Sequence, residues 1–122
     1  MSTSGSSSGI PVKHKFIVYA PDKTEPGTLE RRLSIRPTHI DNVKQLNKDG
    51  LILTGGAMLT PDSIAPDAPS KKFFGSVVIY EATSLEEVRG HVERDVYYTS
   101  GVWDPERIII MPFALALPWP QN

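Results

Sequence analysis

The chain has 122 residues, of which 39% are hydrophobic, enough for one compact core and too few for two. Thirteen basic and fourteen acidic residues give a formal charge of -1 at pH 7. Nucleic acids and anionic membranes usually require a one-sided positive field, so we expect neither as a partner. There is no cysteine, which excludes disulfides and thiolate metal sites and fits a cytoplasmic protein.

Both ends of the chain are expected to lie outside the domain. The opening MSTSGSSSG lacks the apolar core of a secretory signal and the arginines of a transit peptide. No run of about 18 apolar residues suggests a membrane span. We therefore predict a disordered tail over residues 1–12, one domain over residues 13–118 and a C-terminal tail over residues 119–122.

The first predicted elements are a strand and a long helix. HKFIVYA, residues 14–20, is β-branched and aromatic and precedes Pro21, which predicts a buried strand and then a loop. Apolar residues recur at helical spacing over residues 29–49, and Gly50 ends the pattern. Pro37 lies inside this helix, so either the main helix begins there or a shorter first turn meets it at a kink.

Two strands follow, joined by a long loop. LILTGGAML, residues 51–59, and KFFGSVVIYEA, residues 72–82, have the composition of strands, and the segment between them is polar and rich in proline. Within the first of them, Gly55-Gly56 favours a bulge or a close backbone approach over a ligand site.

The last predicted elements are a helix and an edge strand. Ser84 and Glu87 form a capping box for a helix that runs to about Asp95. RIIIMPFALAL, residues 107–117, predicts a strand in which Pro112 suits an edge or a bulge.

The order β-α-β-β-α-β predicts an α+β, ferredoxin-like fold, with a four-stranded antiparallel sheet and both helices on one of its faces. The other face would leave aromatic and β-branched side chains in water. We therefore expect a second copy of the chain to cover it in a homodimer.

Basic residues gather on the first predicted helix. If the helix continues through Pro37, Arg32, Arg36 and His39 lie along one side of it. Asp95 would lie at the end of the second helix, where the dipole disfavours a carboxylate by roughly 0.3–1 kcal/mol. His39 is a candidate partner, because both helices lie on the same face of the sheet. The pair would be either an imidazole oriented for acid–base catalysis or a structural tie between the helices.

Four segments resemble the YCII-related (YciI-like) family over residues 14–117. They are YAPDKTEPGTLERRLSIRPTHIDNVKQL, GLILTGGAML, GSVVIYEATSLEEV and ERDVYYTSGVWDPERIIIMPF. The resemblance implies a ferredoxin-like domain that dimerises into an α/β barrel with a His and Asp pair as its active site. On that pattern, His39 and Asp95 are the catalytic pair, and Asp22, Arg32 and Arg36 are the polar residues that accompany it and bind substrate.

The resemblance says little about the reaction, although at least one relative eliminates chloride from a chlorinated hydroxyquinol. We expect elimination, isomerisation or a similar lyase-type reaction on a small, aromatic or enolisable anion. His39 would be the general acid or base, and Asp95 would fix its orientation. Arg32 and Arg36 would hold the anionic group. The pocket wall would consist of Tyr97, Tyr98 and Trp103.

Neither a metal nor a cofactor is expected. His14, His39 and His91 lack the spacing of metal ligands, and no glycine-rich phosphate loop is present. Arg31 has a simpler interpretation, a surface pair with Glu25 or Glu30. The competing hypothesis for the whole chain is a non-catalytic dimeric domain that binds a small molecule or another protein.

Overall fold

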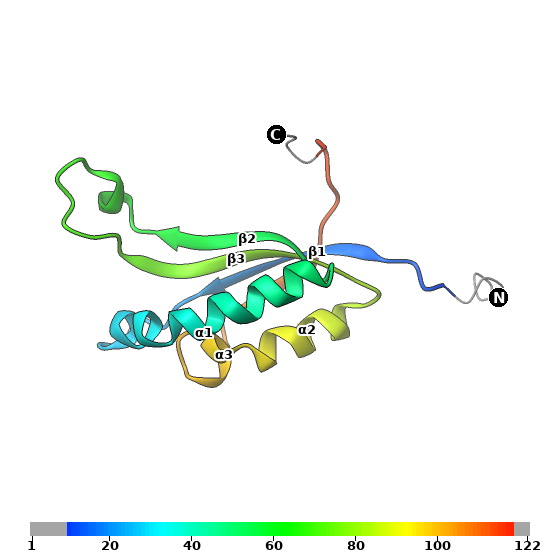
Figure 1. The fold of residues 1–122 in the computed structure, drawn as a ribbon, viewed down its shortest axis with the longest axis horizontal. Coiled ribbons are helices and arrows are strands. Elements are labelled where there is room, and N and C mark those ends of the chain that lie inside the picture. Colours follow the sequence, from blue (N-terminus) through cyan, green and yellow to red (C-terminus); the bar gives the residue numbers. More distant parts are fainter. Residues whose placement is uncertain (1–9, 119–122) are drawn as a thin grey trace.

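The computed structural model describes residues 10–118, so most of the predicted N-terminal tail and the whole C-terminal tail lie outside the described residues. In chain order the elements are β1 (His14–Pro21), α1 (Thr28–Lys48), β2 (Ile52–Leu59), the 3-10 turn η2 (Pro61–Ile64), β3 (Phe73–Ala82), α2 (Leu85–Arg94), α3 (Val96–Thr99) and β4 (Ile109–Pro112). The strands form one antiparallel sheet in the order β2-β3-β1-β4. Figure 1 shows the helices as a second layer on one face of this sheet. The ferredoxin-like prediction is confirmed.

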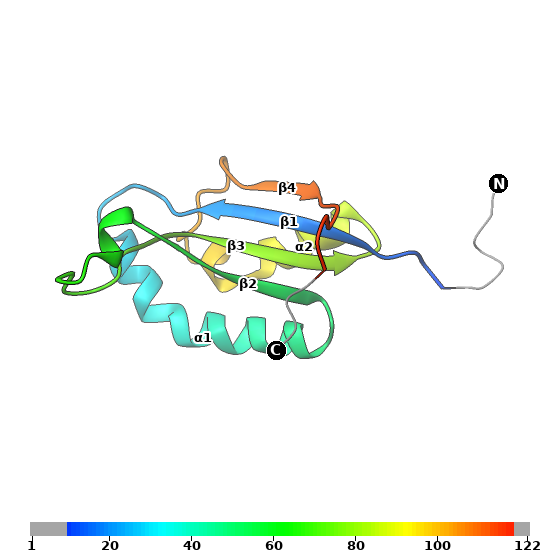
Figure 2. The ribbon, with the colours of Figure 1, turned by 90° about the horizontal axis from the view of Figure 1, so that it is seen from above.

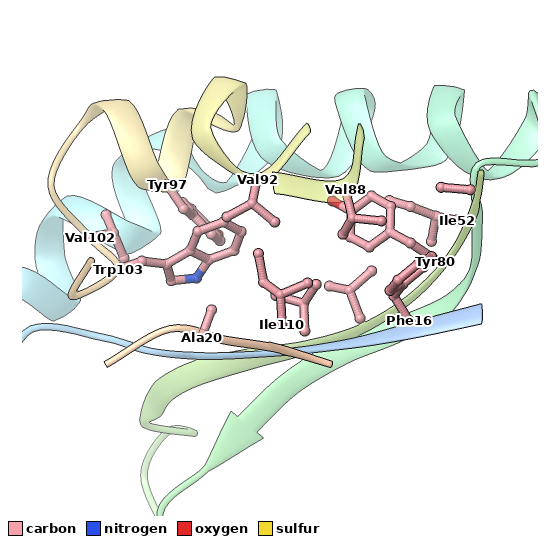
Figure 3. Packing of buried hydrophobic residues seen from close by; sticks show 13 residues of the cluster. Phe16, Ala20, Ile52, Tyr80, Val88, Val92, Tyr97, Val102, Trp103 and Ile110 are labelled. Atoms are coloured by element: carbon pink, nitrogen blue, oxygen red, sulfur yellow. The ribbon is translucent and has the colours of Figure 1, made fainter. Parts of the chain in front are cut away.

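The register of β1 decides which side chains enter the core. Val18 is opposite Val78 of β3 on one side and Ile110 of β4 on the other, and all three are buried. Since side chains alternate between the two faces of a strand, these residues lie on the helix side of the sheet. Val88 and Val92 of α2 are buried against this layer, as Figure 3 shows.

The helix α1 is continuous through Pro37, which resolves the two alternatives left open by the sequence. Pro37 is exposed, so water can reach the carbonyl of Leu33 that loses its helical donor, and this limits the penalty of a proline inside a helix. Figure 2 shows α1 running along the β2 edge of the sheet, with α2 behind β1 and β3.

The last strand is shorter than predicted. β4 contains only Ile109–Pro112, and after the amide of Phe113 donates to the carbonyl of Lys15 at 2.9 Å the chain leaves the sheet. Pro112 lies on an edge strand, as predicted, where its missing N–H costs no ladder hydrogen bond on the open side.

The second face of the sheet carries several large apolar side chains, one ion pair between Lys15 and Glu81, and no helix among the described residues (Figure 1). Tyr19, Ile109 and Met111 are 38%, 50% and 55% exposed there. Within residues 10–118, no helix is long and apolar enough to cross a membrane.

Candidate functional site

Asp95 lies at the junction of two helices rather than simply at the end of one. It follows α2 and begins α3, and its carboxylate oxygen Oδ1 accepts a hydrogen bond from the amide of Tyr97 at 2.9 Å. The predicted conflict between Asp95 and the dipole of the second helix is therefore offset, because the carboxylate caps the N-terminus of α3. The four-residue helix α3 was missed because so short a segment has no periodic signal.

His39 and Asp95 form a buried pair that joins α1 to this junction. Nδ1 of His39 lies 2.9 Å from Oδ1 of Asp95, and their side chains are 9% and 5% exposed. A carboxylate only accepts hydrogen bonds, so in the neutral imidazole the proton lies on Nδ1 and Nε2 is an acceptor. Within residues 10–118, Nε2 has no hydrogen-bond partner.

The ring of Tyr97 fixes the orientation of the imidazole. The rings of Tyr97 and His39 stack with centroids 3.8 Å apart and an angle of 14° between their planes. The guanidinium carbon of Arg32 lies 4.6 Å from the centroid of the same tyrosine ring. Arg32 and His39 are two helical turns apart, about 10 Å along the axis of α1. Tyr97 therefore occupies the interval between them.

A buried ion pair lies beside the His39–Asp95 pair. Nη1 of Arg32 donates to Oδ1 of Asp22 at 2.7 Å, and the two side chains are 3% and 5% exposed. Nη2 of Arg32 donates to the hydroxyl of Ser76 at 3.0 Å, and the indole N–H of Trp103 donates to the same oxygen at 3.2 Å. Burial raises the pKa of Asp22, although the charge of Arg32 opposes this. The charge of Arg32 is thus compensated inside the protein.

A cavity of about 500 Å³ opens between α1 and the β2–β3 half of the sheet, a size suited to a small ligand. It exists because the positions of β2 opposite Val78 and Ser76 are the small residues Gly55 and Ala57. A Cβ at Gly55 would lie 2.9 Å from the carbonyl oxygen of Val77, so the close strand pairing requires glycine there. The predicted close approach is correct for Gly55, and Gly56 also lines the cavity.

The cavity is positively charged although the chain as a whole is nearly neutral. Arg32, Arg36 and Lys44 are among its lining residues, and within the described part of the chain no Asp or Glu is. The guanidinium carbon of Arg36 lies 5.6 Å from the ring centroid of Phe73, and no carboxylate of residues 10–118 pairs with it. Arg36 therefore offers the cavity a charge that Arg32 does not.

A profile of the YCII-related domain matches residues 15–114, most of the chain. The chain belongs to the YCII-related domain family. It is 39% identical to Protein YciI of Escherichia coli over 98 residues, which are 80% of this chain and 94% of the relative. It is 30% identical to Aspercryptin biosynthesis cluster protein B of Emericella nidulans over 81% of this chain and 62% of the relative.

A solved structure with a similar fold is the 5-chloro-2-hydroxyhydroquinone dehydrochlorinase TftG of Burkholderia phenoliruptrix, in complex with 2,5-dihydroxybenzoquinone. The two chains are 27% identical, and the TM-score is 0.67 over 82% of this chain and 93% of that one. The similarity therefore covers most of this chain.

In this member of the YCII-related family, the predicted site residues separate into two groups. The first group lines the cavity and consists of Arg32, Arg36, His39 and Tyr97. Trp103 is 1% exposed and lies edge-on to His39 at 6.0 Å without lining the cavity. Asp22 is likewise bound to Arg32, so Trp103 and Asp22 lie behind the residues that line the cavity.

Two other residues considered in the sequence analysis, Tyr98 and Arg31, do not line the cavity. Tyr98 is half-buried against the core. Arg31 lies 3.8 Å from Glu25, the surface pair that the sequence suggested. Within residues 10–118, no group of three or more His, Asp or Glu residues could hold a metal ion.

The sequence did not point to Ser76. A single serine on the inner face of a strand is common. Ser76 is distinguished only because Arg32 and Trp103 both donate to its oxygen. The one available signal was a small polar residue within the largely apolar run of residues 73–80.

Proposed function

We propose that this chain is a cofactor-independent enzyme that uses His39 as a general base and acid on a small anionic, aromatic or enolisable substrate. One observation carries the proposal: His39 donates from Nδ1 to Asp95 and keeps Nε2 unpartnered, within the described residues, beside a cavity of about 500 Å³. An imidazole held in this way has a fixed tautomer and an available lone pair.

The proposed reaction moves one proton at a time. Nε2 of His39 removes a proton from the substrate, and the electron pair left behind forms a new double bond. In an elimination, a leaving group departs with its bonding electrons; in an isomerisation, His39 returns the proton to another atom. Asp95 keeps Nδ1 protonated throughout and stabilises the imidazolium that forms. Neither the elimination nor the isomerisation consumes an oxidant or a reductant.

The cavity supports a planar anionic substrate. Arg36 supplies the uncompensated charge, and the rings of Tyr97 and His39 supply flat surfaces. Burial raises the pKa of Tyr97, so its phenol stays neutral. The relative TftG supports the same class of substrate, because it is named a dehydrochlorinase and its structure holds a dihydroxybenzoquinone.

The test is proton exchange catalysed by matched histidine variants. Small enolisable and hydroxyaromatic acids are incubated with the protein in deuterated water, and deuterium uptake and halide release are followed by NMR. We expect His39→Asn to lower turnover by about 10²- to 10⁴-fold, with Asp95→Asn also impaired. His91→Asn is the control, because His91 stacks on Tyr80 and does not line the cavity.

Two results would count against the proposed function. One is turnover in His39→Asn equal to that of the wild type. The other is tight binding of these acids without exchange in any variant, which would favour the alternative of a non-catalytic ligand-binding domain.

We also propose that the protein is a homodimer that buries the open face of the sheet. Three large apolar residues there, Tyr19, Ile109 and Met111, are at least 38% exposed in the single chain, and a second copy is an economical cover. Sedimentation at micromolar concentration should give a dimer for the wild type and a monomer for Met111→Glu. A wild-type monomer would overturn the proposal.

A further inference from the structure

The hydroxyl of Ser76 occupies an unusual position in the hydrogen-bond network. It is buried, at 3% exposure, and it lies on β3 opposite the small residue Ala57 of β2. It also lines the cavity that contains His39. The proposed function leaves it unused.

The two neighbours of this hydroxyl can only donate hydrogen bonds. Nη2 of Arg32 donates to Oγ at 3.0 Å and the indole nitrogen of Trp103 donates at 3.2 Å. Neither a guanidinium nor an indole N–H can accept. Both lone pairs of the serine oxygen are therefore occupied, and the third staggered position around the oxygen must hold its proton.

That proton has no acceptor in the described part of the protein. No hydrogen bond in which Ser76 Oγ donates is present within residues 10–118, although a buried hydroxyl normally satisfies its donor. Because Ser76 lines the cavity, a ligand there is in a position to supply the missing acceptor.

The same network makes the hydroxyl a strong donor. A hydroxyl that accepts two hydrogen bonds, one of them from a cation, is polarised and donates more strongly through its own proton. The arrangement is also rigid, since Arg32 is held by Asp22 and Trp103 is buried. A donor that needs no rearrangement is what an oxyanion site requires.

We propose that Ser76 is a catalytic residue whose hydroxyl donates a hydrogen bond to an oxygen of the substrate on which negative charge develops. This deepens the proposed function and rests on it: when His39 removes a proton from an enolisable or phenolic substrate, the charge moves to a carbonyl or ring oxygen. The substrate class is thus narrowed to molecules with such an oxygen within reach of both Ser76 and His39.

The first experiment measures binding and does not depend on turnover. The probes are 4-nitrophenolate and its chloro- and fluoro-substituted analogues, all studied at a pH at which they are ionised. Their affinities for the wild type should rise with the basicity of the phenolate oxygen, and the absorption band of bound 4-nitrophenolate should shift to shorter wavelength. In Ser76→Ala, the dependence on basicity and the spectral shift should both be lost.

Thr54→Val is the control for the loss of a hydroxyl near the cavity, because Thr54 borders the same cavity but lies opposite Ile79 and, within residues 10–118, no cationic group donates to its oxygen. Thr54→Val should keep the wild-type slope of affinity against phenolate basicity. Ser76→Thr retains a hydroxyl and should restore most of the slope, which keeps the test decisive if Ser76→Ala folds poorly. An equal slope in wild type and Ser76→Ala, or an equal loss in Thr54→Val, would overturn the inference.

The second experiment uses whichever acid the proton-exchange test identifies. Ser76→Ala should lower kcat about 100-fold or more while changing KM little, as the loss of one oxyanion donor does. A purely structural serine would not give this separation. The two experiments can also disagree. If the affinities depend on phenolate basicity as expected but His39→Asn turns over like the wild type, the proposed role of His39 is wrong, whereas Ser76 is still a hydrogen-bond donor to a bound oxygen.

Discussion

The two buried pairs of a basic residue and an aspartate beside Tyr97 look alike but leave different groups free. Arg32 and Asp22 meet at 2.7 Å, and His39 and Asp95 meet at 2.9 Å, in both cases with almost no exposure. Arg32 uses both terminal nitrogens on buried protein groups. His39 uses only one of its two ring nitrogens within the described residues.

The difference follows from the chemistry of the two basic groups. A guanidinium only donates and keeps its charge, so once buried it needs a permanent counter-ion, and Asp22 provides one. An imidazole has one nitrogen that donates and one that accepts, so it can be anchored and reactive at the same time. The Arg32 pair therefore builds the site, and the His39 pair is suited to act in it.

The comparison is tested most severely by replacing each basic residue. Arg32→Met should lower the free energy of unfolding by about 3–5 kcal/mol at pH 7, because it leaves the carboxylate of Asp22 buried without a partner. His39→Asn should cost only about 1 kcal/mol, because Asp95 keeps the amide of Tyr97 as a donor. Urea denaturation of both variants measures the difference, and equal losses would show that the two pairs have the same role.

The pH dependence identifies the cause of the Arg32 effect. Burial already raises the pKa of Asp22, and removing the opposing charge of Arg32 raises it further. A carboxyl with a raised pKa in the folded state stabilises the fold below its unfolded pKa and loses this contribution as pH rises through the folded pKa. The deficit of Arg32→Met should therefore shrink as pH falls from 7 toward the acid range. A constant deficit would show that Asp22 is not its source.

Ser76→Ala should have a smaller effect on stability. It leaves one N–H of Arg32 and the indole N–H of Trp103 without their acceptor, which typically costs about 1–3 kcal/mol. Thr54→Val, at an exposed position on β2, should change stability little. Thermal unfolding followed by tryptophan fluorescence separates the two variants, and the same melting temperature for both would mean that the buried network contributes nothing.

The fold was predictable because its signals are local. The alternation of Phe16, Val18 and Ala20 and the capping box before α2 each identify an element without reference to the rest of the chain. β4 was predicted too long because residues 113–117 are apolar, and composition alone does not show where a strand loses its partner. The continuity of α1 depended on the exposure of Pro37, which is a tertiary property.

The site was predictable only in part, for the same reason. Helical spacing brought Arg32, Arg36 and His39 to one side of α1, as observed. Spacing cannot show that Asp22 neutralises Arg32 and leaves Arg36 free, because that depends on the position of β1 relative to α1. The hydroxyl of Ser76 was missed because its role comes from two donors that are distant in sequence.

His91 tests whether stacking without a carboxylate is enough to build such a site. Its ring stacks on Tyr80 with centroids 6.0 Å apart, as that of His39 does on Tyr97, but within residues 10–118 no carboxylate pairs with it. Burial first and then Arg94 lower its pKa from 6.5, while Glu87 opposes the change.

The expected effect of His91 on stability is small and has a definite sign. Because the folded state favours the neutral imidazole, its contribution is present above pH 6.5 and is lost as pH falls through the lowered pKa. His91→Gln should remove this slope, with a change in melting temperature of less than about 2 °C between pH 7.5 and pH 5. Parallel melting curves for the two proteins would contradict the assignment. The predicted slope would mark His91 as a histidine whose surroundings favour its neutral form.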